Sequence, residues 1–239
     1  NRVNVAGMAP VVAVPTTAGT GSEVGRASVI TDDAAHIKRI IFHARMLPAL
    51  VILDPELTLG LPAKITAATG MDALSHNLEA FCSPLFHPMA EGIALEGMRL
   101  VQQYLPRAVA QGSDVEARLQ MLVASSMGAT AFQRGLGAMH ALAHPLGALY
   151  DAHHGLLNAV LMPYVLVANR ERIEPQMEKM ARYLNLAKPG FTGVLEWVMA
   201  LREQVGIPHT LGEIGIDDTR IAQVGQMAEV DPSAGTNPI

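Results

Sequence analysis

Cysteine is nearly absent from this sequence, since Cys82 is the only one among 239 residues. A single thiol excludes an intramolecular disulfide framework and a zinc site built from cysteines. Cys82 directly follows a largely apolar helical pattern, so we interpret it as a packing residue rather than a nucleophile. This cysteine usage is most compatible with the reducing cytoplasm, where we expect the protein to reside.

Basic clusters and long apolar runs are missing as well. The formal net charge is −5, the isoelectric point is near 6.0, and lysine and arginine form no run. This balance argues against nucleic acid or an anionic membrane as the partner and favours small molecules. No segment is as long and uninterrupted as a membrane span requires, and the first residues do not resemble a signal peptide. Because the first residue is Asn1 rather than methionine, we expect a cropped or processed start.

Hydrophobic residues, by contrast, make up 50% of the chain, and from Pro62 onward they recur with the period of a helix. Breaks with residues typical of turns fall at 83–84, 111–114, 188–190 and 206–208. Helices are predicted at Ala68–Phe81, Met89–Tyr104, Val115–Gln133, Ala138–Leu149, Leu156–Asn169, Ile173–Leu184, Thr192–Val205 and Thr219–Ala228. The sequence therefore predicts an all-helical domain over residues 62–239.

Residues 1–61 show short apolar runs instead. Val11–Pro15 predicts a buried strand, and it opens into the glycine-rich segment 16–21 (TTAGTG). A strand followed by such a loop suits a nucleotide site, although a Gly/Thr segment is more often an ordinary turn. No Gly-Lys-Thr/Ser follows, so the loop is not of the Walker type. Further short strands are predicted at Ala27–Thr31, Arg39–His43 and Leu50–Asp54.

Five of the nine histidines lie in two segments, one near residue 76 and one spanning residues 140–154. Asp72 and His76 are four residues apart, as are His140 and His144, so each pair lies on one face of a predicted helix. A lone pair of this kind is more often solvated or hydrogen-bonded than metal-binding. An aspartate among imidazoles on apolar helices must be paired, protonated or metal-bound, and this set suits Fe(II) or Zn(II) better than Ca or Mg.

Four segments of the chain resemble motifs of a known family. Segments 15–23 (PTTAGTGSE), 67–76 (AATGMDALSH), 140–147 (HALAHPLG) and 153–155 (HHG) are similar to motifs of the iron-containing (group III) alcohol dehydrogenases, which include lactaldehyde reductase and propanediol dehydrogenases. The resemblance extends to the Asn237-Pro238 pair. It implies four metal ligands, Asp72, His76, His140 and His154. It also implies a proton-handling or cofactor-contacting role for His144 and cofactor contacts from Lys38 and the loop residues Thr16, Thr17, Thr20 and Ser22.

The family resemblance also implies the architecture. Residues 1–61 would be the C-terminal part of a Rossmann-like α/β nucleotide-binding domain, and residues 62–239 an all-helical metal-binding domain, as in dehydroquinate synthase-like proteins. The family's Gly-Gly-Gly-Ser pyrophosphate loop does not occur before Val11, and its last helix after Asn237-Pro238 is also missing. We therefore expect this chain to be a fragment of a longer enzyme, with the upstream half of its nucleotide domain absent.

The predicted activity is hydride transfer between NAD or NADP and a small alcohol, aldehyde or ketone, with a divalent metal polarising the substrate oxygen. Fe(II) is the expected metal and Zn(II) a possible substitute, in a homo-oligomer that we expect to be a dimer. His144 is the expected proton relay, and Phe132, Leu136 and Tyr150 are expected near the substrate. Two alternatives remain, a metal-binding module without turnover and a metallohydrolase. The hydrolase is disfavoured because Ala141 follows His140, where a His-Glu-x-x-His protease has its general base.

Overall fold

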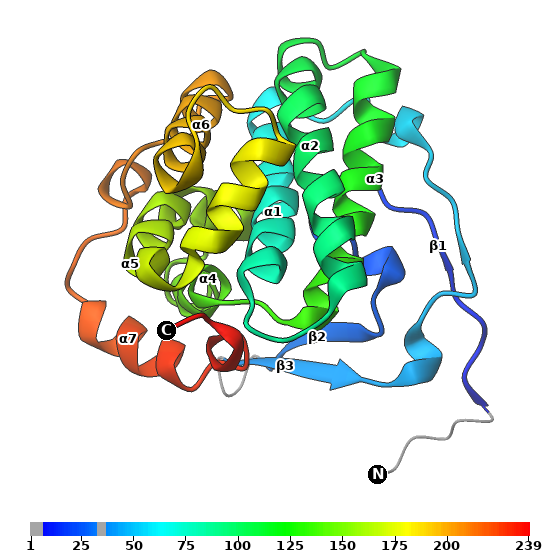
Figure 1. Cartoon of the computed structure of the whole chain (residues 1–239). Coiled ribbons are helices and arrows are strands. Elements are labelled where there is room, and N and C mark those ends of the chain that lie inside the picture. Colours follow the sequence, from blue (N-terminus) through cyan, green and yellow to red (C-terminus); the bar gives the residue numbers. More distant parts are fainter. Residues whose placement is uncertain (1–6, 33–36) are drawn as a thin grey trace.

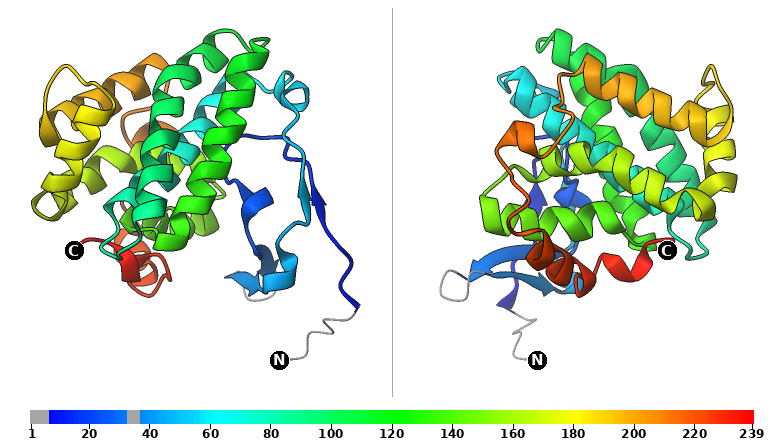
Figure 2. Two further views of the ribbon diagram at one scale, coloured as in Figure 1. Left: turned by 45° about the vertical axis from the view of Figure 1, so that its right-hand side comes forward. Right: turned by 90° about the vertical axis from the view of Figure 1, so that its left-hand side faces the viewer.

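The computed structural model describes residues 7–32 and 37–239, and it has a small strand region followed by a larger helical region (Figure 1). This order of strands and helices confirms the predicted fold class. The strands lie to one side of the helices, and the helical region makes up most of the molecule (Figure 2).

The strand region contains two small separate sheets. Strand β1 (Val12–Ala13) pairs in parallel with β4 (Leu50–Val51), and β2 (Ala27–Asp32) pairs antiparallel with β3 (Ile37–Phe42). All four strands were predicted to within a few residues, but the prediction that the first strand is buried is wrong, because Val12 is 57% exposed. The polar turn predicted between β2 and β3 includes Asp33–His36, which lie outside the described residues.

The helical region begins directly after Pro62, whose fixed φ suits the start of a helix. No strand occurs from residue 62 to residue 239, a range that the structure describes completely. The helices are α1 (Ala63–Cys82), α2 (Pro88–Ala110), α3 (Val115–Ala131), α4 (Ala138–Tyr150), α5 (His154–Tyr183), α6 (Gly190–Gln204) and α7 (Ile221–Glu229). Among the residues described, none of these helices combines the length and the hydrophobicity needed to cross a bilayer.

The prediction of separate helices at Leu156–Asn169 and Ile173–Leu184 is wrong, because α5 is one continuous helix through both segments. Arg170, Glu171 and Arg172, which lie between the two predicted helices, are good helix formers, and all three are exposed. An exposed ion pair between Arg170 and Glu174, one turn apart, is compatible with the uninterrupted helix. The polar residues 170–172 are therefore an exposed part of one helix and do not mark its end.

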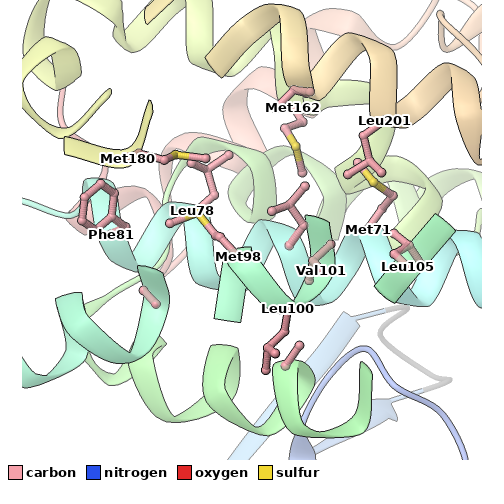
Figure 3. Close-up of a cluster of buried hydrophobic side chains, with 14 of the residues drawn as sticks. Met71, Leu78, Phe81, Met98, Leu100, Val101, Leu105, Met162, Met180 and Leu201 are labelled. Carbon is pink, nitrogen blue, oxygen red and sulfur yellow. The ribbon is translucent and has the colours of Figure 1, made fainter. Parts of the chain in front are cut away.

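Helix α1 lies at the centre of the molecule, with α2, α3 and α5 packed around it (Figure 1). Met71 and Leu78 of α1 are fully buried and belong to the same hydrophobic cluster as Met98 and Leu105 of α2 (Figure 3). Burying each side chain of this size contributes about 1.5–3 kcal/mol to folding. Because almost every residue of α1 after Ile65 is buried, its polar side chains need partners inside the protein.

Candidate metal centre

Asp72 and His76 project from the same face of α1, as their spacing predicted. Both side chains are buried, with 3% of each residue exposed. His140, the third residue of α4, is only 1% exposed, and its ring stacks on that of His76 with ring centroids 4.6 Å apart. The potential ligand atoms of Asp72, His76 and His140 all lie within 4.8 Å of one another. Three of the four predicted ligands therefore converge at one buried point.

His154, the first residue of α5, lies next to this group and is contributed by a third helix. Its Nε2 lies 3.6 Å from Asp72 Oδ1, and its side chain is one third exposed. The close approach of α5 to α1 depends on Gly155, since a Cβ there would overlap the carbonyl oxygen of Ala68 and crowd Asp72. The neighbouring His153 instead caps α5, where its Nδ1 accepts the backbone N–H of Leu156 at 3.4 Å. The Nδ1 of His153 is therefore engaged at the start of α5 rather than in the metal cluster.

A buried amide that the sequence analysis did not single out completes the cluster. Asn158 is fully buried on α5, one turn after His154. Its Nδ2 lies 2.9 Å from Asp72 Oδ1, 3.2 Å from His140 Nε2 and 3.1 Å from His154 Nε2. Donation to a carboxylate fixes the amide orientation, because the reverse orientation would place two oxygens in contact. The spacing of four residues from His154 was the only local signal for this residue.

Glu79 was not predicted from the sequence either, and it contacts His140 on the side of the ring that faces away from Asn158. Its Oε2 is 2.6 Å from His140 Nδ1, and its Oε1 accepts the backbone N–H of Met139 at 2.7 Å. Burial raises the pKa of Glu79 to about 7, although the backbone N–H groups at the start of α4 and the nearby His76 oppose the rise. Glu79 is thus a second carboxylate of the cluster, in contact with only one imidazole.

The electrostatics of the cluster favour an ionised Asp72 and a neutral His140. Burial alone would raise the pKa of Asp72, but the imidazoles of His76, His154 and His140 and the Asn158 hydrogen bond lower it below 3.8. Loss of solvation, followed by repulsion from His76, lowers the pKa of His140 well below 6.5. A carboxylate together with imidazoles is the donor set that Zn(II) and Fe(II) prefer. The residues present therefore fit a borderline divalent metal.

His144 lies beside this group rather than within it. Its ring stacks on His154 with centroids 5.3 Å apart and an interplanar angle of 11°. Its Nδ1 is 2.9 Å from Oδ2 of Asp231, a residue near the end of the chain that the sequence analysis did not consider. Burial would raise the pKa of Asp231, but the hydrogen bonds from His144 and Ser233 outweigh this and lower it. An ionised Asp231 accepts from His144 and so fixes the ring.

The glycine-rich loop runs along the outside of the metal cluster. Its Gly19 and Gly21 are buried against α1 and α3, while Thr16, Thr17, Thr20 and Ser22 are exposed. The carbonyl oxygen of Gly19 lies 3.3 Å from Nδ1 of His76, and Glu23 accepts from Ser126 of α3 at 2.5 Å. The loop is therefore held on the helical region with its hydroxyl groups turned outward.

Three further residues, Lys38, Phe132 and Tyr150, were predicted to lie near the cofactor or the substrate. The side chain of Lys38 lies outside the described part of the structure. Phe132 packs against His76, with ring centroids 5.1 Å apart, so it borders the cluster. Tyr150, at the other end of α4, contacts Asp217 and Arg220 instead.

Comparison with known proteins gives two matches to family models. Residues 66–239 match the C-terminal part of the Fe-containing alcohol dehydrogenase family, and residues 1–55 match the iron-containing alcohol dehydrogenase model. A 4-hydroxybutyrate dehydrogenase from Cupriavidus necator is 43% identical over 240 residues, which cover 96% of this chain and 62% of the relative. The chain thus spans about three fifths of the length of the curated relatives it matches.

Solved structures give the same result. The crystal structure of a 1,3-propanediol oxidoreductase superposes with a TM-score of 0.92 at 38% identity, covering 96% of this chain and 62% of that one. A sulfoacetaldehyde reductase from Bifidobacterium kashiwanohense in complex with NAD⁺ superposes with a TM-score of 0.89 at 32% identity, covering 96% and 61%.

Proposed function

Because the chain belongs to the iron-containing alcohol dehydrogenase family, we propose that it is the metal-binding part of an enzyme that transfers hydride between a nicotinamide nucleotide and a small alcohol or aldehyde. The proposed ligands are Asp72, His76, His140 and His154. The observation that carries the proposal is the buried convergence of Asp72, His76 and His140, with their ligand atoms within 4.8 Å of one another. An ionised carboxylate in such surroundings needs a counter-charge.

The proposed metal is Fe(II), with Zn(II) as a substitute, since both accept one carboxylate and several imidazoles. When bound, the metal supplies the positive charge that polarises the substrate's carbon–oxygen bond. Asp72 contributes the negative charge that balances the ion, and the imidazoles contribute neutral donors. Phe132, packed on His76, adds apolar surface that excludes water from this side of the cluster.

His144 is proposed to handle the proton of the alcohol. An ionised Asp231 accepts from Nδ1 of His144, so in the neutral ring Nδ1 carries the proton and Nε2 is the acceptor. Nε2 is then the atom that takes up a proton when the alcohol is oxidised. The partly exposed position of His144, at 36% of its side chain, gives the proton a route to solvent.

The nicotinamide nucleotide is proposed to bind along the exposed hydroxyls of Thr16, Thr17, Thr20 and Ser22, with further contacts from Lys38 and His144. Buried glycines on the opposite side of the loop support this, because they let the loop backbone lie close to the metal cluster. The NAD⁺ complex of the sulfoacetaldehyde reductase supports NAD or NADP as the cofactor class.

Residues 1–61 are proposed to be part of a larger nucleotide-binding domain, and residues 62–239 the catalytic domain. Apolar side chains on the strands support this, since Val12 and Leu50 of the parallel pair are each more than half exposed. Parallel sheets are normally covered on both faces. We place the enzyme in the reducing cytoplasm as a homo-oligomer, a dimer in its simplest form.

The substrate class is proposed from the relatives. Those described above are named for 4-hydroxybutyrate, 1,3-propanediol and sulfoacetaldehyde, all small molecules with a terminal alcohol or aldehyde. The test is absorbance of the reduced cofactor when the full-length, metal-loaded protein receives NAD⁺ or NADP⁺ and such an alcohol. Metal binding without any turnover would favour the non-catalytic module, and metal-dependent ester or peptide cleavage would favour the hydrolase.

A further inference from the structure

Glu79 is a buried carboxylate that the proposed ligand set leaves unexplained. It lies on the same face of α1 as Asp72 and His76, and only 5% of it is exposed. Within the described residues it forms no ion pair with lysine or arginine, and its second oxygen contacts the imidazole of His140. Burying a carboxylate without a cationic partner is costly, so its retention needs a specific cause.

One cause is structural, since Glu79 caps α4. The N-cap residue of α4, Gly137, has no side chain to accept the first backbone N–H groups. Glu79 Oε1 accepts the N–H of Met139, and Asn237 Oδ1 accepts that of Ala138 at 3.0 Å. Capping accounts for only one of the two carboxylate oxygens.

The second oxygen acts on His140. Glu79 Oε2 lies 2.6 Å from Nδ1, while on the other side of the ring the Asn158 amide lies 3.2 Å from Nε2. The Asn158 nitrogen can donate but not accept, so a proton on His140 Nε2 would point at the amide hydrogens. His140 Nε2 is therefore the unprotonated nitrogen and Nδ1 carries the proton that Glu79 accepts.

We propose that Glu79 is a positioning residue that holds His140 in the Nδ1–H tautomer and so directs the Nε2 lone pair at the metal. This inference rests on the proposed metal-binding function. Carboxylates in this position orient metal-bound histidines and increase their basicity. Because Glu79 and His76 lie on one helix, α1 sets the position of ligands on both α1 and α4.

Glu79→Gln separates the two roles of the side chain. The amide oxygen still caps Met139, but the amide nitrogen now donates to His140 Nδ1 and moves the ring proton to Nε2. We expect zinc affinity of the full-length protein, measured by competition with a chromophoric chelator, to fall roughly 10–100-fold. Asn237→Ala is the matched control, since it removes the other cap of α4 without touching His140. It should keep wild-type zinc affinity while lowering stability to urea.

A measurement on the wild-type protein keeps the proposal testable if Glu79→Gln does not fold. Nitrogen-15 NMR of the zinc-loaded, histidine-labelled protein should show His140 protonated at Nδ1. A proton on Nε2, wild-type zinc affinity in Glu79→Gln, or an equal loss of affinity in Asn237→Ala would each overturn the role of Glu79. Failure of the wild-type protein to bind any divalent metal would instead contradict the proposed function.

Discussion

Nδ1 of His144 and Oδ2 of Asp231 are 2.9 Å apart and join α4 to the segment that follows α7. The two residues are separated by 87 positions in the sequence. The contact fixes one ring nitrogen of His144 as a donor and leaves the other as an acceptor beside the metal cluster. His144 is thus held next to the proposed ligands without being one of them.

Replacing His144 by alanine should therefore separate proton handling from metal binding. We expect His144→Ala to keep its metal and to lose about 10²-fold in turnover, as is typical for loss of a general acid–base group. Elemental analysis and the pH–rate profile of the purified full-length protein measure the two properties.

His140→Ala is the comparison, because it removes a proposed ligand from the same helix. Its metal content should fall together with its activity. If His144→Ala also loses its metal, His144 is a ligand, and if it keeps wild-type turnover at every pH, His144 has no part in the reaction.

Asn158→Asp should make the thermal stability of the protein depend more strongly on a bound metal ion. The substitution places a second carboxylate about as close to Asp72 as the 2.9 Å amide contact it replaces. Two carboxylates at this distance repel, so the melting temperature of the metal-free protein should fall by several degrees. Added Zn(II) should raise it by more than in the wild type.

Asn169→Asp provides the control for that experiment. Asn169 is another buried amide of α5, but it pairs with Asn237 rather than with the metal cluster. Its substitution should destabilise the protein without increasing the response to Zn(II). Equal responses of the two variants would show that the zinc effect does not come from the Asp72 cluster.

Gly21→Ala should detach the glycine-rich loop. Gly21 has φ of +64°, and a Cβ would overlap the side chain of Ala129 and the carbonyl of Ser125 on α3. We expect the free energy of unfolding, measured in urea, to fall by roughly 1–3 kcal/mol and nucleotide binding to weaken. Gly60→Ala, where no atom lies within 4 Å, should change neither property. Wild-type nucleotide affinity in Gly21→Ala would contradict a cofactor role for the loop.

Cys82 should react with thiol reagents only after unfolding. Burial, reinforced by the nearby Glu79, raises the pKa of the Cys82 thiol from 9.0 to about 12. The folded protein therefore keeps the proton that the unfolded chain releases above pH 9, so stability should fall as the pH rises from about 9 toward 12. Iodoacetamide at pH 8.5 tests the first point by mass spectrometry, and labelling of the native protein there would contradict the burial.

The sequence predicted those parts of the site that depend on local spacing. Asp72, His76 and His140 could be identified because helical periodicity places them on buried faces and the family motifs align with them. Glu79 could not, because its contact with His140 spans 61 positions and nothing near either residue indicates it. The continuity of α5 was missed for a related reason, since its charged residues lie on an exposed face that only the packing defines.

The position of the metal tests the account most directly. Crystals of the full-length protein grown with Zn(II) or, without oxygen, Fe(II) should give one anomalous-scattering peak at the absorption edge of the metal. We predict that this peak lies about 2.0–2.2 Å from the ligand atoms of Asp72, His76, His140 and His154. A fully loaded protein with its only peak elsewhere, or with these four side chains too far apart to share an ion, would contradict the account.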